Sequence, residues 1–269
     1  MKTIITYKPL QFFLMTFTLT WVFWFLSELF IHNQNIKMIF LLLGLIIPFS
    51  TALFLIFTSK NKVMKEIFFK KLLDIRLVKI NYIPAILFIP PISIVISILI
   101  STLFGFSINQ FTIAKSFSFH IATMPTLLVL FLAASFEELG WRGYAIESLN
   151  TKYNYFKTTA IFAVLWSLWH LPLFFISQTY QNDILQLNLW YAINFIISII
   201  PLAFVISWIC KKNSSSIPAA ILLHFGINIS QEMFMITPET KCIQTFVLII
   251  FASIIVWMNK EMFFSVVKQ

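Results

Sequence analysis

Apolar stretches of about 20 residues recur along the whole chain, and this feature constrains the fold more than any other. A helix needs about 20 residues to cross a hydrocarbon core of about 30 Å. Of the 269 residues, 59% are hydrophobic and 11% are charged, whereas a soluble domain has about 25% charged residues. Backbone groups in lipid must be satisfied within the segment, and these stretches lack the alternation of membrane strands. The sequence therefore predicts an all-α, polytopic membrane protein.

We predict a single integral membrane domain over residues 1–269, with about eight transmembrane helices and no soluble domain. The first apolar stretch is longer than the apolar region of a cleaved signal peptide, and no small-residue cleavage site follows it. The spans are expected at about 10–31, 37–58, 82–105, 121–147, 157–177, 187–209, 217–236 and 243–264.

The longest polar connection, residues 59–81, has two interpretations. It is either an ordinary positive loop or a basic amphipathic helix on the membrane surface. The amphipathic helix is suggested by apolar residues that recur at helical spacing between the lysines: Met64, Ile67, Phe68, Leu72 and Ile75.

Basic residues are distributed unevenly between the two faces that eight spans define. The face with both termini would carry 16 of the 19 lysines and arginines. Only Lys37, Lys115 and Lys241 fall on the other face. Positively charged loops stay in the cytoplasm, so both termini are expected on the cytoplasmic side. The protein itself is expected in the plasma membrane of a bacterium. This asymmetry accounts for the formal net charge of +9, so membrane lipid is an expected partner and nucleic acid is not.

Ionisable residues inside the apolar stretches gather in the fourth, fifth and seventh spans. A charge near the bilayer centre costs roughly 2.5–3.5 kcal/mol on insertion scales, so such a residue needs a partner or a function. Glu137 and Glu138 are adjacent, and neighbours on a helix point about 100° apart. Glu138 and Arg142, at i and i+4, form a pair that neutralises itself. Glu137 has no such partner and is the candidate general base.

The fifth and seventh spans add two histidines and an asparagine. Trp166 and His170 share one helical face, and so do His224 and Asn228. The candidates Glu137, His170, His224 and Asn228 lie 12 to 16 residues from flanking lysines, or roughly 18–24 Å along a helix. They are therefore expected at one depth. Each alone has a plainer interpretation, such as interhelical hydrogen bonding or a proton site, but together they favour hydrolysis.

These residues resemble the motifs of the CAAX prenyl endopeptidase and bacteriocin-processing family, also called CPBP or ABI, of intramembrane glutamic endopeptidases. The family's first motif is two glutamates, three residues and arginine, as in Glu137–Arg142. The second is phenylalanine, three residues and histidine, matched by Trp166–His170 with tryptophan in place of phenylalanine. The third is histidine, three residues and asparagine or aspartate, as in His224–Asn228. The motif core covers residues 137–228.

The resemblance implies an intramembrane endopeptidase that cleaves a membrane-associated peptide or protein, lipidated in the family's eukaryotic members. It implies that Glu137 and His170 activate a water molecule, with no cofactor. His224 and Asn228 would donate hydrogen bonds to the developing oxyanion, each worth roughly 3–4 kcal/mol. The residues with structural or substrate-positioning roles would be Glu138, Arg142 and Trp166.

Three alternatives stay open at this point. A zinc ion held by Glu137, His170 and His224 would also suit hydrolysis, although the compact His-Glu-x-x-His helix is absent from the sequence. A non-proteolytic immunity or binding protein against a peptide toxin would have the same spans. A proton-coupled transporter would also use buried carboxylates, but it predicts pseudo-symmetric halves that this sequence does not show.

Overall fold

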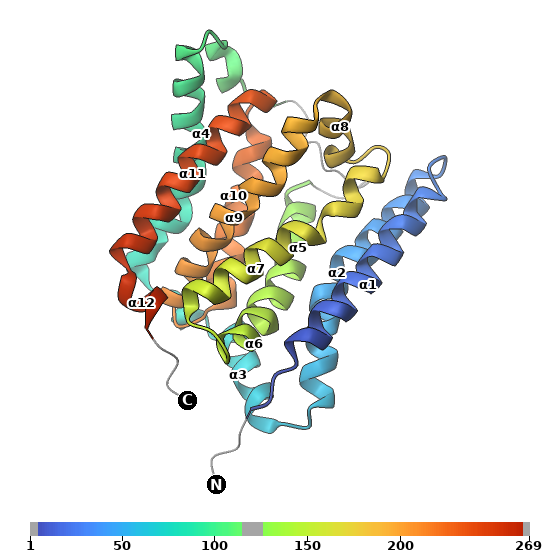
Figure 1. The fold of residues 1–269 in the computed structure, drawn as a ribbon, viewed down its shortest axis with the longest axis vertical. Coiled ribbons are helices and arrows are strands. Elements are labelled where there is room, and N and C mark those ends of the chain that lie inside the picture. Colours follow the sequence, from blue (N-terminus) through green and yellow to red (C-terminus); the bar gives the residue numbers. More distant parts are fainter. Residues whose placement is uncertain (1–4, 115–125, 266–269) are drawn as a thin grey trace.

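Long helices that run back and forth between two ends make up the protein (Figure 1). The computed structural model describes residues 5–114 and 126–265. Within them, the only strand-like pairing is an isolated bridge between Ile113 and Phe234. The predicted all-α class is therefore confirmed. The long helices are α1 (Pro9–Glu28), α2 (Gln34–Thr58), α4 (Ile83–Leu103), α5 (Thr126–Gly140), α7 (Tyr155–Trp169), α9 (Leu189–Lys212), α10 (Ile217–Met233) and α11 (Pro238–Met258).

Six helical segments among the described residues are long and apolar enough to cross a membrane. They are Pro9–Glu28, Gln34–Thr58, Ile80–Leu103, Tyr155–Phe175, Leu189–Lys212 and Pro238–Met258. The protein is therefore a polytopic helical membrane protein. The other two predicted spans, 121–147 and 217–236, contain α5 and the 17-residue α10, and residues 121–125 lie outside the described residues. A total of eight spans stays a prediction.

The two described ends of the chain lie at the same end of the bundle (Figure 1). Helices α1, α4, α7 and α10 run away from this end, and α2, α5, α9 and α11 return to it. The same end holds the short helices α3 (Lys62–Leu73), α6 (Ile146–Asn150) and α12 (Lys260–Phe264). We call it the basic end, because it carries the lysine-rich connection 59–81. The opposite end holds α8 (Tyr180–Leu187).

The connection 59–81 contains a helix, which favours the amphipathic interpretation over a plain loop. The Asn61 side chain accepts a hydrogen bond from the Met64 N–H at 3.0 Å and caps α3. Met64 and Phe68 are buried, whereas Lys62 and Lys70 are exposed. The apolar face of α3 contacts α10 and the turn after α5, so the helix closes the basic end of the bundle.

Two breaks in the long helices lie beside the polar residues of the motifs. Helix α5 continues directly into a π-helical turn, η4 (Trp141–Ala145), and then into α6. Such turns occur frequently at functional sites. Helix α7 ends at Trp169 and is followed by a 3-10 helix, η5 (Leu171–Phe175), which contains Pro172. His170 therefore lies at the helix end, where the backbone changes direction.

Candidate active site

The four candidate catalytic residues line one cavity inside the bundle. Its volume is about 540 Å³, and its lining includes Glu137, His170, His224 and Asn228. These side chains come from α5, the C-terminal end of α7, and α10. The structure thus brings together residues that lie up to 91 positions apart in the sequence. Much of the remaining wall is apolar and comes from α2, α5 and α9: Leu41, Leu42, Leu45, Leu130, Ile199 and Leu202.

Glu137 is a buried carboxylate held by two indole groups. Its Oε2 accepts hydrogen bonds from Trp166 Nε1 at 2.8 Å and from Trp141 Nε1 at 3.3 Å. No lysine, arginine or histidine forms an ion pair with it among the described residues. Indole donors orient the carboxylate without neutralising it. The hydrogen-bonding role of Trp166 was not predicted, and neither was any role for Trp141, although its i, i+4 spacing from Glu137 was an available signal.

Glu138 is the centre of a second, charged group. Its Oε1 lies 2.8 Å from Arg142 NH1 and 2.9 Å from His224 Nδ1. The Arg142 guanidinium also lies 4.8 Å from the centre of the Phe162 ring. The expected ion pair between Glu138 and Arg142 is present, and both side chains are fully buried. The contact with His224, which ties α10 to α5, spans 86 positions and could not be seen in local spacing.

The hydrogen bond made by His170 defines its tautomer. Its Nδ1 lies 2.8 Å from the backbone carbonyl oxygen of Trp166. A carbonyl oxygen only accepts, so Nδ1 carries the proton, and Nε2 of the neutral ring is an acceptor. The ring packs against Trp169 and Phe195, with centroids 4.8 and 5.6 Å away. His170 can therefore hold a water molecule or accept a proton at Nε2.

Asn228 lies one helical turn after His224, half-buried in the cavity wall. Helix α10 is positioned by Ser216, whose hydroxyl accepts the Ala219 N–H at 3.3 Å, and by Pro218 in its first turn. This is the serine cap and early proline that favour a helix start.

A metal site of the kind that zinc would need is not assembled in the described part of the chain. No three His, Cys, Asp or Glu side chains within residues 5–114 and 126–265 form a group that could hold a metal ion. Glu137, His170 and His224 line the same cavity, but their hydrogen bonds are to indoles, a carbonyl and Glu138.

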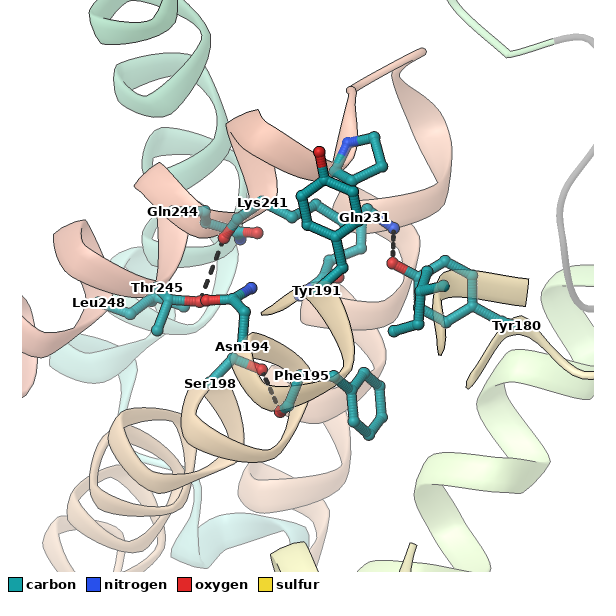
Figure 2. Close-up of a pocket in the computed structure, with 12 residues that line it drawn as sticks. Tyr180, Tyr191, Asn194, Phe195, Ser198, Gln231, Lys241, Gln244, Thr245 and Leu248 are labelled. Carbon is teal, nitrogen blue, oxygen red and sulfur yellow. Dashed lines mark hydrogen bonds between the residues drawn. The ribbon is translucent and has the colours of Figure 1, made fainter. Parts of the chain in front are cut away.

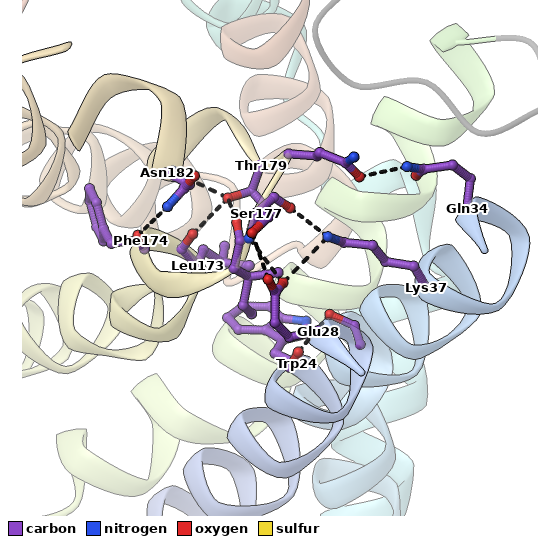
Figure 3. Close-up of polar contacts among 12 residues, drawn as sticks. Trp24, Glu28, Gln34, Lys37, Leu173, Phe174, Ser177, Thr179 and Asn182 are labelled. Carbon is purple, nitrogen blue, oxygen red and sulfur yellow. Dashed lines mark hydrogen bonds and ion pairs between the residues drawn. The ribbon is translucent and has the colours of Figure 1, made fainter. Parts of the chain in front are cut away.

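The cavity reaches the end of the bundle opposite the basic end. A cluster of polar side chains lies beside the cavity there. Figure 3 shows Lys37 of α2 between Glu28 of α1 and Ser177. Lys37 Nζ lies 2.6 Å from the Ser177 carbonyl oxygen and 3.4 Å from Glu28 Oε2, and Lys37 is only 2% exposed. Beside this cluster, Gln34 donates to Gln178 at 2.5 Å, and both glutamines line the cavity. The cluster joins the α1–α2 hairpin to the segment before α8.

The fold and the cavity define a class: a helical membrane protein with carboxylate, imidazole and amide groups gathered inside the bundle. Comparison with known proteins specifies it further. Residues 119–230 match the family described as type II CAAX prenyl endopeptidase, Rce1-like. The chain is also 42% identical over 262 residues to CAAX prenyl protease 2 of Methanococcus maripaludis, covering 96% of this chain and 97% of that protein.

The chain belongs to the CAAX prenyl protease family, as the motifs had indicated. It is an intramembrane endopeptidase, and its substrate is a peptide or protein. All seven residues singled out in the sequence lie within the matched region.

Proposed function

We propose that this endopeptidase hydrolyses its substrate with a water molecule activated by Glu137 and His170. The observation that carries the proposal is the pairing of two groups in one cavity: a carboxylate without a cationic partner among residues 5–114 and 126–265, and an imidazole with an acceptor Nε2. Glu137 takes one proton from the water molecule as the water oxygen bonds to the scissile carbonyl carbon. The same proton then passes to the amide nitrogen as the C–N bond breaks.

His224 and Asn228 are the proposed donors to the carbonyl oxygen as negative charge develops on it. When His224 Nδ1 donates to Glu138, its Nε2 can donate only if the ring is doubly protonated. The Glu138 oxygen lies 2.9 Å from Nδ1 and orients the ring. Glu138 would then act on the reaction through His224, as a positioning residue, and Arg142 would fix Glu138. Preorganised donors of this kind are typically worth about 3 kcal/mol each.

The proposed substrate is a lipidated peptide segment at a protein C-terminus. The relative from Methanococcus maripaludis carries the name CAAX prenyl protease 2, and a CAAX motif is a C-terminal cysteine followed by three residues. The leucines and isoleucine of the cavity wall offer an apolar surface for a prenyl chain.

Mapping of new peptide termini by mass spectrometry tests this proposal in membranes that contain the native protein or its variants. Glu137→Ala and His170→Ala should each abolish the new termini while protein levels stay equal. The matched control is Glu66→Ala, which changes an exposed glutamate on α3. Activity lost after treatment with a chelator and restored by zinc would instead support a metalloprotease. Termini that persist in Glu137→Ala would contradict the role of Glu137, and native membranes without new termini would favour the binding or immunity alternative.

A further inference from the structure

A small polar recess adjoins the active-site cavity at the end opposite the basic end. It measures about 30 Å³ and lies between α8, α9, α10 and α11 (Figure 2). A space of this size holds about two water molecules, or one carboxylate group. Tyr180, Gln231 and Lys241 line both the recess and the cavity with Glu137. The active-site cavity therefore continues into a recess that is lined by the ammonium group of Lys241.

The ammonium group of Lys241 has N–H donors beyond the one that bonds to Tyr180. It lies in the first turn of α11, and its Nζ donates to the Tyr180 hydroxyl at 2.9 Å and lies 4.3 Å from the centre of the Tyr180 ring. An ammonium group carries three donors. Lys241 forms no ion pair with a carboxylate in the described part of the chain. The neighbouring Glu239 instead accepts a hydrogen bond from Tyr191. A partly buried lysine of this kind suits an anionic ligand.

The position of the recess along α10 suggests which anion it binds. His224 and Gln231 are seven residues apart on this helix, which corresponds to about 10 Å. Three extended residues also span about 10 Å. A CAAX substrate has three residues between the bond after its cysteine and its terminal carboxylate. With that bond beside His224, the carboxylate would reach the level of Gln231 and Lys241.

We propose that Lys241, with Tyr180 and Gln231, binds the C-terminal carboxylate of the substrate. This inference rests on the proposed function and adds a specificity determinant to it. The subsite would make the enzyme cleave at a fixed distance from a free C-terminus, and it would reject a chain that continues or ends in an amide.

The test compares two S-farnesylated peptides that end in cysteine and three neutral residues, one with a free carboxylate and one with a carboxamide. The native protein should cleave the acid with a kcat/KM about 10-fold higher than the amide, the effect of one charge-assisted hydrogen bond. Lys241→Gln should remove this preference, and Lys241→Arg should keep it. The matched control is Lys260→Gln, because Lys260 also lies over an aromatic ring, 5.6 Å from the centre of Trp257, but at the basic end.

Binding of the same peptides to Glu137→Gln protein separates this inference from the proposed chemistry. Tighter binding of the acid that disappears in Glu137→Gln/Lys241→Gln supports the subsite, even if the native protein cleaves neither peptide. Equal or absent binding of acid and amide, or a preference that survives Lys241→Gln, overturns the subsite and leaves the roles of Glu137 and His170 standing. An equal loss for both peptides in Lys241→Gln also overturns it, and assigns Lys241 to packing or to a lipid phosphate.

Discussion

At the scale of single residues, the two adjacent glutamates differ in what holds them. Glu138 faces a guanidinium and an imidazole, so its charge is balanced inside the bundle. Glu137 faces two indole N–H groups, which donate hydrogen bonds but carry no charge. A carboxylate fixed in direction but not neutralised can still take a proton from water. The contrast supports a structural role for Glu138 and a chemical role for Glu137.

Trp166→Phe tests whether the indole hydrogen bond to Glu137 contributes to catalysis. The change keeps a ring in the position where the family has phenylalanine and removes the donor at 2.8 Å. Hydrogen bonds to charged groups are worth about 1.5–3 kcal/mol, so kcat/KM should fall about 10-fold. Trp208→Phe is the control, because the buried Nε1 of Trp208 has no hydrogen-bond partner among the described residues. Unchanged activity in Trp166→Phe would show that the ring alone suffices.

Arg142→Ala should harm the fold more than the chemistry. Arg142 is 1% exposed, and its loss leaves the Glu138 charge buried without its cation. Breaking a buried pair from one side typically costs about 3–5 kcal/mol. We expect a lower apparent melting temperature in detergent and reduced yield. Arg76→Ala, which removes an exposed pair with Asp74, should change neither. A stable Arg142→Ala protein that lacks activity would move Arg142 into substrate binding.

At the scale of elements, close helix contacts hold the polar segment in place. A Cβ on Gly140 of α5 would lie 2.4 Å from the Pro48 carbonyl carbon of α2, whereas one on Gly226 of α10 would lie 3.4 Å from Pro90 Cγ. Gly140→Ala should therefore force the backbones apart and destabilise the protein by about 1–3 kcal/mol. Gly226→Ala should be close to neutral, since alanine gains up to about 1 kcal/mol in helix propensity. Equal melting temperatures for the two variants would contradict this packing.

Local spacing in the sequence predicted those elements and contacts that depend on one helix. The apolar stretches located the long helices, and i, i+4 spacing located the pair of Glu138 with Arg142. The contact of Glu138 with His224 and the burial of Lys37 depend on side chains from different helices, so no local pattern encodes them. The π-helical turn after α5 was missed for a related reason. Its residues pack against other helices, with Gly140 close to Pro48 of α2 and Gly143 close to Phe68 of α3.

At the scale of the whole molecule, the direction of the cavity conflicts with the predicted orientation. The cavity reaches the end lined by Gln34 and Gln178, opposite the basic end, which holds both described ends of the chain. If the basic end is cytoplasmic, as the lysine distribution predicts, substrates enter from the other side of the membrane. Prenylation of a C-terminal CAAX motif, by contrast, anchors proteins on the cytoplasmic leaflet. The lysine distribution and a cytoplasmic CAAX substrate therefore cannot both be correct for this chain.

Cysteine labelling in intact cells decides between the orientation predicted from the lysines and a cytoplasmic CAAX substrate. The background is Cys242→Ser, because the other cysteine, Cys210, is buried. Asn35→Cys places a thiol in the exposed first turn of α2 near the cavity rim, and Lys152→Cys places one at the basic end. The lysine distribution predicts that a membrane-impermeant maleimide labels Asn35→Cys in intact cells, and Lys152→Cys only after permeabilisation, a result that would contradict the proposed CAAX substrate. That result would direct the substrate search to peptides on the outer face of the membrane. The reverse pattern would overturn the orientation predicted from the lysines and place the cavity where cytoplasmic lipidated C-termini can enter.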